Sequence, residues 1–408
     1  MRDAAEELGI YVSVPFCRAK CSYCNFASGV FGAERMEQYI DRVCREIAGA
    51  RARAQGYGAE LPDRVDTVYL GGGTPSLLGA GLVRRLFEGI RAEFEVQPAA
   101  EVTLECAPGQ LEEATLDEFL RQGVNRVSFG VQSFVDREAR AVGRQHTRKI
   151  CLAEIQRMRA AGVENVNVDL IVGLPQQTAE SWQESVEVAA ESGAPHVSVY
   201  MLEVDEDSRL GREMMATGLR YGAGAVPADD AIADWYAAGC YWLEAAGVRQ
   251  YEISNFARDG RESRHNMKYW RRDPYLGFGL DAHSMLRRGI EGVRWANEDD
   301  LEAYLSPGQR SEGPLRQIGS STKNEVQLVD REQAFEEAIF LGLRMNAGVD
   351  LKALQANFGD ALLQPMLEAV RDAVEAGLLV REENTLRLTL RGRMASNEVF
   401  SRLLVEHV

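Results

Sequence analysis

Residues 11–26 read YVSVPFCRAKCSYCNF, and three cysteines follow an apolar, β-branched run that is typical of a β-strand. Cys17, Cys21 and Cys24 have the spacing Cys-x3-Cys-x2-Cys. Cysteine thiolates hold iron–sulfur clusters, and four of them usually complete a 4Fe-4S cube. Three protein ligands leave one iron with an open coordination position, where a cofactor or substrate can bind, as at the open position of catalytic zinc sites. The stretch therefore predicts a 4Fe-4S cluster with one free iron position.

Two other interpretations of the three cysteines stay open, a zinc site completed by a distant histidine and a chance grouping. Structural zinc usually shows a second close pair of ligands, such as Cys-x2-Cys or His-x3-His, and the sequence contains none. The chain has seven cysteines, an odd number that is a poor disulfide framework and favours a reducing compartment. We expect the other four to be buried small hydrophobic residues. They are Cys44, Cys106, Cys151 and Cys240.

Outward from this stretch, short apolar runs alternate with amphipathic helical stretches. The expected strands cover residues 10–14, 65–70, 101–106, 126–131, 166–172 and 196–200. The expected helices lie near residues 34–53, 81–95, 114–122, 148–161 and 178–191. Strands separated by helices pair in parallel through crossover connections. The predicted fold class is therefore α/β, a partial (β/α)6 barrel, with a doubly wound sheet as the alternative.

Glycine-rich and polar segments follow these strands, at the end where active sites of β/α barrels gather. They are GGGTP at 71–75, residues 105–108, Gln132 and residues 169–175. Glycines after a strand let backbone groups approach a ligand closely. The arrangement predicts a ligand site assembled from several strand ends. Residues 204–228 give no prediction.

The C-terminal part of the chain differs in composition from the rest. Residues 305–330 are rich in Ser, Gly and Pro and predict a linker or loop between residues 1–304 and 331–408. Helices are expected at 331–345, 350–356 and 360–376, two strands within 378–390, and a helix at 391–405. Three helices and a hairpin predict a mainly α, winged-helix-like domain. Acidic residues outnumber basic ones after residue 350, so we do not expect this domain to bind DNA.

Charge and hydropathy narrow the class of protein further. The 408 residues carry a formal net charge of −16, which argues against nucleic acids and anionic membrane surfaces as partners. The first residues, MRDAAEELG, are acidic and lack the apolar segment of a signal peptide. No apolar run approaches the roughly 20 residues that a membrane span needs. We therefore expect a cytoplasmic protein.

The cysteine motif, with Tyr23 before the third cysteine, resembles that of the radical S-adenosylmethionine (SAM) superfamily. In that superfamily the open iron chelates the methionine end of SAM, and an electron from the cluster generates a deoxyadenosyl radical. YVSVPFC, GGGTPS, TLECAPG, RVSFGVQSF, GRQH and NVDLIVGLPQQT resemble, in order, motifs of the coproporphyrinogen-dehydrogenase group. The resemblance implies that eight residues surround SAM. They are Tyr11, Gly72, Gly73, Thr74, Glu105, Gln132, Arg144 and Asp169.

Two features are similar to the HemW branch of this group. The decarboxylating HemN branch has a further cysteine two residues after the third, and this chain has Phe26 there. RHNMKYW at 264–270 contains the H-N-x-x-Y-W motif that is typical of HemW proteins. The chain departs from the group's pattern at Ser13, where histidine is usual, at Ser263, where cysteine is common, and in GLDAHS in place of G-A-G-A-H-S. These departures bear on the haem site more than on the cluster.

The HemW resemblance implies a haem chaperone that carries a 4Fe-4S cluster and SAM, binds haem and delivers it to an acceptor protein such as a respiratory enzyme. It implies no coproporphyrinogen oxidase activity, a cluster-promoted homodimer and a weak contact with a membrane protein. Neutral imidazole is a common axial ligand of haem iron. His265 is therefore the first candidate for the haem ligand and His283 the second. The alternatives are an oxygen-independent coproporphyrinogen III oxidase, another radical enzyme acting on haem, and a DNA-binding regulator.

Overall fold

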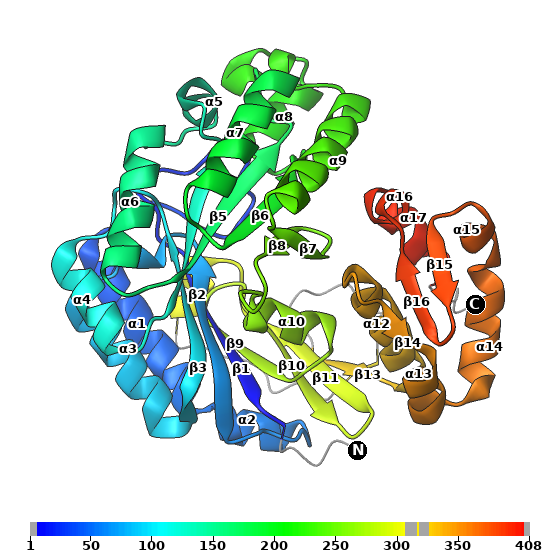
Figure 1. The fold of residues 1–408 in the computed structure, drawn as a ribbon. Coiled ribbons are helices and arrows are strands. Elements are labelled where there is room, and N and C mark those ends of the chain that lie inside the picture. Colours follow the sequence, from blue (N-terminus) through cyan, green and yellow to red (C-terminus); the bar gives the residue numbers. More distant parts are fainter. Residues whose placement is uncertain (1–5, 307–315, 318–325, 404–408) are drawn as a thin grey trace.

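The computed structural model describes residues 6–306, 316–317 and 326–403 of the chain (Figure 1). Its centre is a set of six parallel strands that neighbour one another in sequence order. These strands are β1 (Leu8–Val14), β2 (Arg64–Gly72), β3 (Glu95–Cys106), β4 (Arg126–Gln132), β5 (Asn165–Val172) and β6 (His196–Met201). Each contains one of the predicted apolar runs, and burial on both faces explains why the runs are almost continuously hydrophobic. The predicted α/β class is confirmed.

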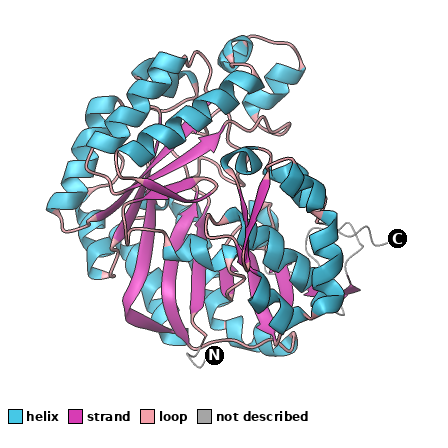
Figure 2. Cartoon of the chain, turned by 45° about the vertical axis from the view of Figure 1, so that its right-hand side comes forward, coloured by secondary structure: helices cyan, strands magenta, loops and turns pink. Residues whose placement is uncertain are grey.

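Helices connect the parallel strands and cover the outside of the curved sheet (Figure 2). They are α1 (Ala33–Ala48), α2 (Ala50–Gly56), α3 (Ala80–Glu93), α4 (Glu113–Arg121), α5 (Asp136–Ala141), α6 (Arg148–Ala160) and α7 (Ala179–Glu191). A doubly wound sheet would reverse its strand order at a switch point. The order β1 to β6 has no reversal, which selects the barrel-like alternative.

The six strands form an open barrel because other strands pair with both outer members. β9 (Tyr275–Phe278) pairs in parallel with β1, and β8 (Asn255–Ala257) pairs antiparallel with β6. The complete sheet has 13 strands in the order β12-β13-β11-β10-β9-β1-β2-β3-β4-β5-β6-β8-β7. The added strands are β7 (Arg249–Glu252), β10 (His283–Arg288), β11 (Glu291–Ala296), β12 (Arg316–Gln317) and β13 (Gln327–Val329).

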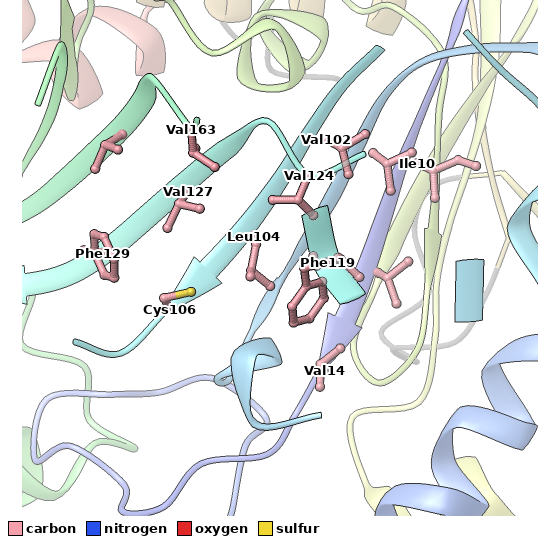
Figure 3. Packing of buried hydrophobic residues seen from close by; sticks show 14 of the residues in the cluster. Ile10, Val14, Val102, Leu104, Cys106, Phe119, Val124, Val127, Phe129 and Val163 are labelled. Carbon is pink, nitrogen blue, oxygen red and sulfur yellow. The ribbon is translucent and has the colours of Figure 1, made fainter. Parts of the chain in front are cut away.

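The main core lies between the sheet and its covering helices. Figure 3 shows part of it, with Phe119 of α4 among apolar side chains of β1, β3 and β4. Cys106 belongs to this core, and Cys151 and Cys240 are buried as predicted, while Cys44 is only half-buried. α8 (Arg209–Met215), η2 (Arg220–Ala225) and α9 (Asp229–Ala245) lie between β6 and β7. No helix among the described residues is long and apolar enough to cross a membrane.

The C-terminal part has a second core of buried apolar side chains. Its elements are α12 (Arg331–Arg344), β14 (Val349–Asp350), α13 (Leu351–Phe358), α14 (Asp360–Ala369), α15 (Arg371–Glu375), β15 (Leu379–Glu382), β16 (Thr385–Leu388), α16 (Leu390–Met394) and α17 (Ser396–Ser401). The helices α12 to α17 and a three-stranded sheet confirm the prediction of a mainly α, winged-helix-like C-terminal part, although the expected helix 360–376 is interrupted at Val370. Much of the expected linker lies outside the described residues, so the predicted domain boundaries stay predictions.

α12 attaches the C-terminal part to the large sheet. Glu337 lies within 2.9 Å of both Arg272 and Arg294, and all three side chains are largely shielded from solvent. The backbone N–H of Ile253 donates to the carbonyl of Arg344 at 3.1 Å. These contacts hold the end of α12 beside α10 (Arg264–Trp270) and the β7–β8 hairpin, close to the carboxyl ends of the parallel strands.

Candidate functional site

The three cysteines lie on a loop that leaves the carboxyl end of β1. Its base is closed by two backbone hydrogen bonds, from Cys17 N to Gly29 O at 2.8 Å and from Gly29 N to Pro15 O at 2.9 Å. Its outer part is held by the N–H of Leu210 in α8, which donates to Ser22 O at 2.8 Å. The region around α8 lies within residues 204–228, for which we made no prediction, and it supports the cysteine loop.

The glycine-rich segment after β2 fixes the start of this loop. Gly73 N donates to Val14 O at 2.9 Å, and Thr74 N donates to Phe16 O at 2.7 Å. A Cβ atom at Gly73 would approach Val14 O to 2.7 Å, so only glycine allows this close contact. The Thr74 hydroxyl lies 3.7 Å from Cys17 Sγ. Gly73 and Thr74 thus hold the first cysteine in place.

Two carboxylates face the same space from β3 and β5. Glu105 accepts hydrogen bonds from Tyr69 Oη at 2.9 Å and from Gly72 N at 3.2 Å. Asp169 accepts from Asn167 Nδ2 at 2.7 Å and from a neighbouring serine. Burial, and then the charge of Asp169, raises the pKa of Glu105 to about 7, and burial also raises the pKa of Asp169. The pair is a shielded acceptor site for the hydroxyl or ammonium groups of a ligand.

Gln132 and Arg144 complete the polar wall with groups that lack partners. Gln132 has φ 69°, a left-handed conformation that is rare for a residue with a side chain, and its buried Oε1 has no hydrogen-bond partner among the described residues. Arg144 donates from Nη2 to Tyr23 Oη at 2.9 Å, and its buried Nε has no partner in the described part of the chain. Unmatched buried polar atoms in a strained conformation fit a site that receives a polar ligand.

The cysteine loop and this polar wall line one cavity of about 510 Å³. That volume falls in the range of about 300–1,000 Å³ that is usual for small-molecule sites. The cavity brings together ten of the twelve predicted site residues. They are Cys17, Cys21, Cys24, Gly72, Gly73, Thr74, Glu105, Gln132, Arg144 and Asp169.

The cysteines and the polar wall fit the group that the sequence implies. Within the described ranges no three His, Cys, Asp or Glu side chains converge on a single ion. A cube-shaped 4Fe-4S cluster does not require convergence, because each thiolate binds a different iron. SAM carries a carboxylate, an amine and ribose hydroxyls, and the wall opposite the cysteines offers a guanidinium, an amide and two carboxylates for them.

Tyr11 lies beside this cavity and lines a smaller one. The second cavity, of about 290 Å³, shares Gly72 and Phe26 with the first. It also contains Tyr269 and His283. His283 begins β10 with an exposed side chain. The structure therefore places Tyr11 and the second haem-ligand candidate together, next to the main cavity.

His265 lies in neither cavity. Its ring is 1% exposed, Nδ1 is 2.8 Å from Thr67 Oγ1, and Nε2 is 2.8 Å from Tyr269 Oη. Burial, and then the charge of Lys268, lowers the pKa of His265 to about 3, so the ring is neutral. The sequence predicted an open iron ligand, but both ring nitrogens are occupied, and His265 instead holds α10 against β2.

A buried hydrogen-bonded chain that the sequence did not reveal connects the acidic pair with α10. Asn167 donates to Asp169 and lies 2.6 Å, through Oδ1, from His196 Nδ1. His196 Nε2 lies 2.9 Å from Tyr251 Oη, which accepts from Ser263 N at 3.1 Å. Ser263 is the N-cap of α10. Asn167 and Asp169 are alternate residues of β5, and His196 is the first residue of β6. The strand order β5-β6-β8-β7 brings Tyr251 of β7 to them.

The C-terminal part supplies the far wall of the main cavity. Arg344, at the end of α12, and Arg393 and Met394, in α16, form this wall, and Tyr236 of α9 lines the same cavity. None of these four residues follows a parallel strand, so sequence reasoning about strand ends had no signal for them. The cavity therefore has one wall from the barrel and one from the C-terminal part.

Comparison with known proteins relates both parts of the chain to families. Residues 11–189 match the model of the Radical SAM superfamily, and residues 329–395 match that of the HemN C-terminal domain. The chain is 32% identical over 397 residues to "Heme chaperone HemW" of Bacillus subtilis (strain 168), covering 97% of this chain and 99% of that protein. It is 34% identical over 400 residues to the protein of the same name in Escherichia coli (strain K12), covering 98% of both.

A solved structure supports the fold. The coproporphyrinogen III oxidase HemN of Escherichia coli superposes with a TM-score of 0.78 over 98% of this chain and 90% of that chain, at 23% identity. At this identity the likeness shows the fold alone, whereas the HemW relatives align over 97% and 98% of this chain. With identity above 30% over nearly its entire length, the chain belongs to the HemW family within the radical SAM superfamily.

Proposed function

We propose that this chain is a cytoplasmic haem chaperone that carries a 4Fe-4S cluster and SAM, binds haem and delivers it to an acceptor protein. The observation that supports it best is the single cavity of about 510 Å³ between the cysteine loop and the C-terminal part. Such a cavity gives a cluster, a cofactor and an apolar ligand access to one another. Relatives described as heme chaperones share the architecture over nearly the whole chain.

In this proposal Cys17, Cys21 and Cys24 hold three irons of the cluster. When bound, the cluster and SAM would supply one-electron chemistry at the sulfonium. Arg144 would pair with the SAM carboxylate, since a guanidinium binds a carboxylate in a bidentate manner. Glu105 and Asp169 would accept hydrogen bonds from the ammonium group and the ribose hydroxyls.

Tyr11, Gly72, Gly73, Thr74 and Gln132 have supporting roles in the proposed cofactor site. Gly72 has φ 97°, and its N–H holds Glu105. Glycine at the preceding position leaves room for the same carboxylate, because a Cβ atom on Gly71 would lie 2.9 Å from Glu105 Oε1. Gln132 would donate or accept through its unmatched amide.

The haem would occupy the main cavity between the barrel and the C-terminal part. Apolar and aromatic side chains such as Tyr200, Met201 and Met394 line that space and would cover a macrocycle. His265 offers no free nitrogen, so in our proposal it positions α10 and does not bind iron. His283, the second candidate named from the sequence, is exposed but lines the smaller cavity, which adjoins the main one at Gly72 and Phe26, so it does not line the space proposed for the haem.

The test is anaerobic reconstitution with iron and sulfide followed by haem titration. We expect the 4Fe-4S absorption to require all three cysteines and a Soret band to saturate near one haem per chain. Cys44→Ser, which removes a half-buried cysteine outside the site, is the matched control. An intact cluster without saturable haem binding would refute the chaperone function.

The rival function is oxygen-independent coproporphyrinogen oxidation. The likeness to HemN concerns the fold, and this chain has Phe26 where the HemN motif continues with cysteine. We expect the reconstituted protein to produce no protoporphyrinogen IX from coproporphyrinogen III under reducing, anaerobic conditions with SAM. Stoichiometric conversion of coproporphyrinogen III to protoporphyrinogen IX would show that the chain is an oxidase and would refute the proposed chaperone function.

In this proposal the acceptor is a haem-requiring respiratory enzyme, and the chain makes a weak contact with a membrane protein to reach it. The cluster promotes a homodimer. The exposed apolar side chains Phe26 and Val30, at 60% and 64% exposure on the cysteine loop, support a protein contact there. Light scattering of the reconstituted protein should show a dimer that is lost in Phe26→Ser. The matched control is Tyr241→Ser, which removes a side chain of 73% exposure on α9.

A further inference from the structure

Two arginines on the C-terminal wall of the main cavity have no acidic partner. Arg344 ends α12, and Arg393 lies in α16. No carboxylate among the residues that the structure describes lies within 4.0 Å of either guanidinium, and the buried Nε of each has no hydrogen-bond partner. The chain has 62 acidic and 46 basic residues, so acidic residues that could pair with a partly buried arginine are abundant. The two guanidiniums therefore place positive charge without an acidic partner among the described residues on this wall of the cavity.

The contacts that these arginines do make leave their charges available. The Arg344 guanidinium lies 4.4 Å from the centre of the Trp270 ring, which orients its plane without neutralising it. Arg393 donates from Nη1 to Leu388 O at 3.4 Å. Burial lowers the pKa of the Arg393 guanidinium, as expected for a cation whose desolvation is not fully offset by a neighbouring negative charge.

The nearest acids are engaged elsewhere or too distant to pair. Glu252 is in the electrostatic field of Arg344 but accepts hydrogen bonds from Ser254 N and from the Asn255 side chain. Glu244 influences Arg393 from an exposed position on α9, beyond ion-pair distance. Keeping two partly buried cations unpaired costs stability, and a bound anion would recover it.

We propose that Arg344 and Arg393 form a carboxylate-binding pair that receives the two propionates of haem. This inference rests on the proposed haem chaperone function and adds the orientation of the ligand. Arginine matches carboxylates in bidentate geometry, and its always-charged guanidinium suits a partly buried site. Haem carries its two propionates on one edge of the ring, and both arginines lie on one wall.

This orientation directs the apolar part of the macrocycle into the cavity. With its propionate edge at the C-terminal wall, the ring would extend past Tyr236 and Met394 toward Tyr200 and the cysteine loop. The C-terminal part would thus recognise the charged edge, while the barrel holds the cluster and SAM. Release of haem would then require only that this wall move away or that its arginines find another anion.

The experiment compares haem with haem dimethyl ester, whose propionates carry no charge, in the same detergent and with the full-length reconstituted protein. We expect wild type to bind haem about a hundredfold more tightly than the ester, about tenfold for each of two charge-assisted bonds. Arg344→Gln and Arg393→Gln should each weaken haem binding about tenfold and leave ester binding unchanged. The double variant should bind both ligands with equal affinity.

Arg371→Gln is the matched control, since Arg371 is exposed on α15 of the same part and does not line the cavity. The ester comparison on wild type needs no variant and therefore stands even if a variant folds poorly. Equal affinity of wild type for haem and the ester would overturn the arginine pair while leaving the chaperone function intact. Absence of haem binding by wild type would overturn both.

Discussion

Glu105 shows how one buried side chain makes the site sensitive to pH. Its carboxyl lies in the cavity wall, with Tyr69 and Gly72 as donors and Asp169 as a neighbouring negative charge. Burial raises the pKa of Glu105 to about 7, whereas an unfolded chain has the ordinary value near 4.3. The ionised Glu105 carboxylate therefore destabilises the cofactor-free fold, and a bound cation or hydroxyl donor would reduce this cost.

The sign of the pH dependence follows from the raised pKa. The folded state holds the Glu105 proton more tightly than the unfolded state. The contribution of Glu105 to stability is therefore fully present below about pH 4.3 and is lost as pH rises to about 7. We expect the free energy of unfolding of the cofactor-free protein to fall by on the order of 3 kcal/mol across this window through Glu105.

Glu105→Gln should remove that component of the slope, as measured by urea unfolding at several pH values. Asp63→Asn is the control, since Asp63 is largely exposed beside Arg51 and far from the cavity. An unchanged slope in Glu105→Gln would show that Glu105 titrates normally. The same substitution should weaken SAM binding at pH 8, where the wild-type carboxylate is ionised.

His265 is expected to affect stability and not the electronic spectrum of bound haem. His265→Ala would leave Thr67 and Tyr269 without their buried partner, at a cost of about 1–3 kcal/mol in the free energy of unfolding. The Soret maximum of the haem complex should stay at its wild-type position. His283→Ala, at an exposed position, should leave the unfolding free energy unchanged. A Soret shift in His265→Ala without loss of stability would assign the iron to His265 after all.

At the scale of elements, α12 is the joint between the two parts of the chain. Its Glu337 is a buried acid between Arg272, after α10, and Arg294 of β11. The same helix ends at Arg344, which contacts Trp270 of α10 and lines the cavity. A shift of α12 would therefore move the C-terminal wall relative to the barrel.

Loss of the Glu337 carboxylate should loosen this joint. Glu337→Ala leaves two shielded arginines facing each other, and breaking such a buried arrangement typically costs about 3–5 kcal/mol. We expect faster amide exchange along α12 and earlier thermal unfolding. Glu332→Ala, at an exposed position in the first turn of the same helix, should cost less than about 1 kcal/mol. Equal effects of the two substitutions would mean that Glu337 does not hold the joint.

At the scale of the whole molecule, the cavity exists because an open barrel meets a second core. β1 and β6 do not pair with each other, and the sheet continues on both sides with strands that contact the C-terminal part. A closed barrel would fill its own interior with side chains. The open form leaves space for large ligands at the carboxyl ends of the strands, covered by α16 and the end of α12.

Haem binding should protect both walls of this cavity at once. We expect amide exchange to slow in residues 17–28 of the cysteine loop and in residues 390–397 around α16 when haem is added, because a ligand that contacts both walls stabilises both against local opening. Exchange in α4, on the outside of the barrel, should not change and serves as the internal control. Protection of only one wall would place the haem outside the shared cavity.

The sequence by itself determined the order of the six parallel strands, their helices and the cysteine loop, because apolar runs, helix periodicity and thiol spacing are local patterns. It also selected ten residues that the fold brings to one cavity. The predicted cluster and SAM contacts at those residues stay predictions.

Only the tertiary structure decided what depends on contacts between distant segments. The pairing of β9 with β1 kept the barrel open, and the two hydrogen bonds of His265 turned a candidate iron ligand into a structural residue. Arg344 and Arg393 lie in segments whose sequence showed no sign of a ligand-binding role, and their availability for an anion depends on which acids the fold places beyond reach. Local patterns specify the parts, whereas burial and pairing across the chain decide which polar groups remain free for a ligand.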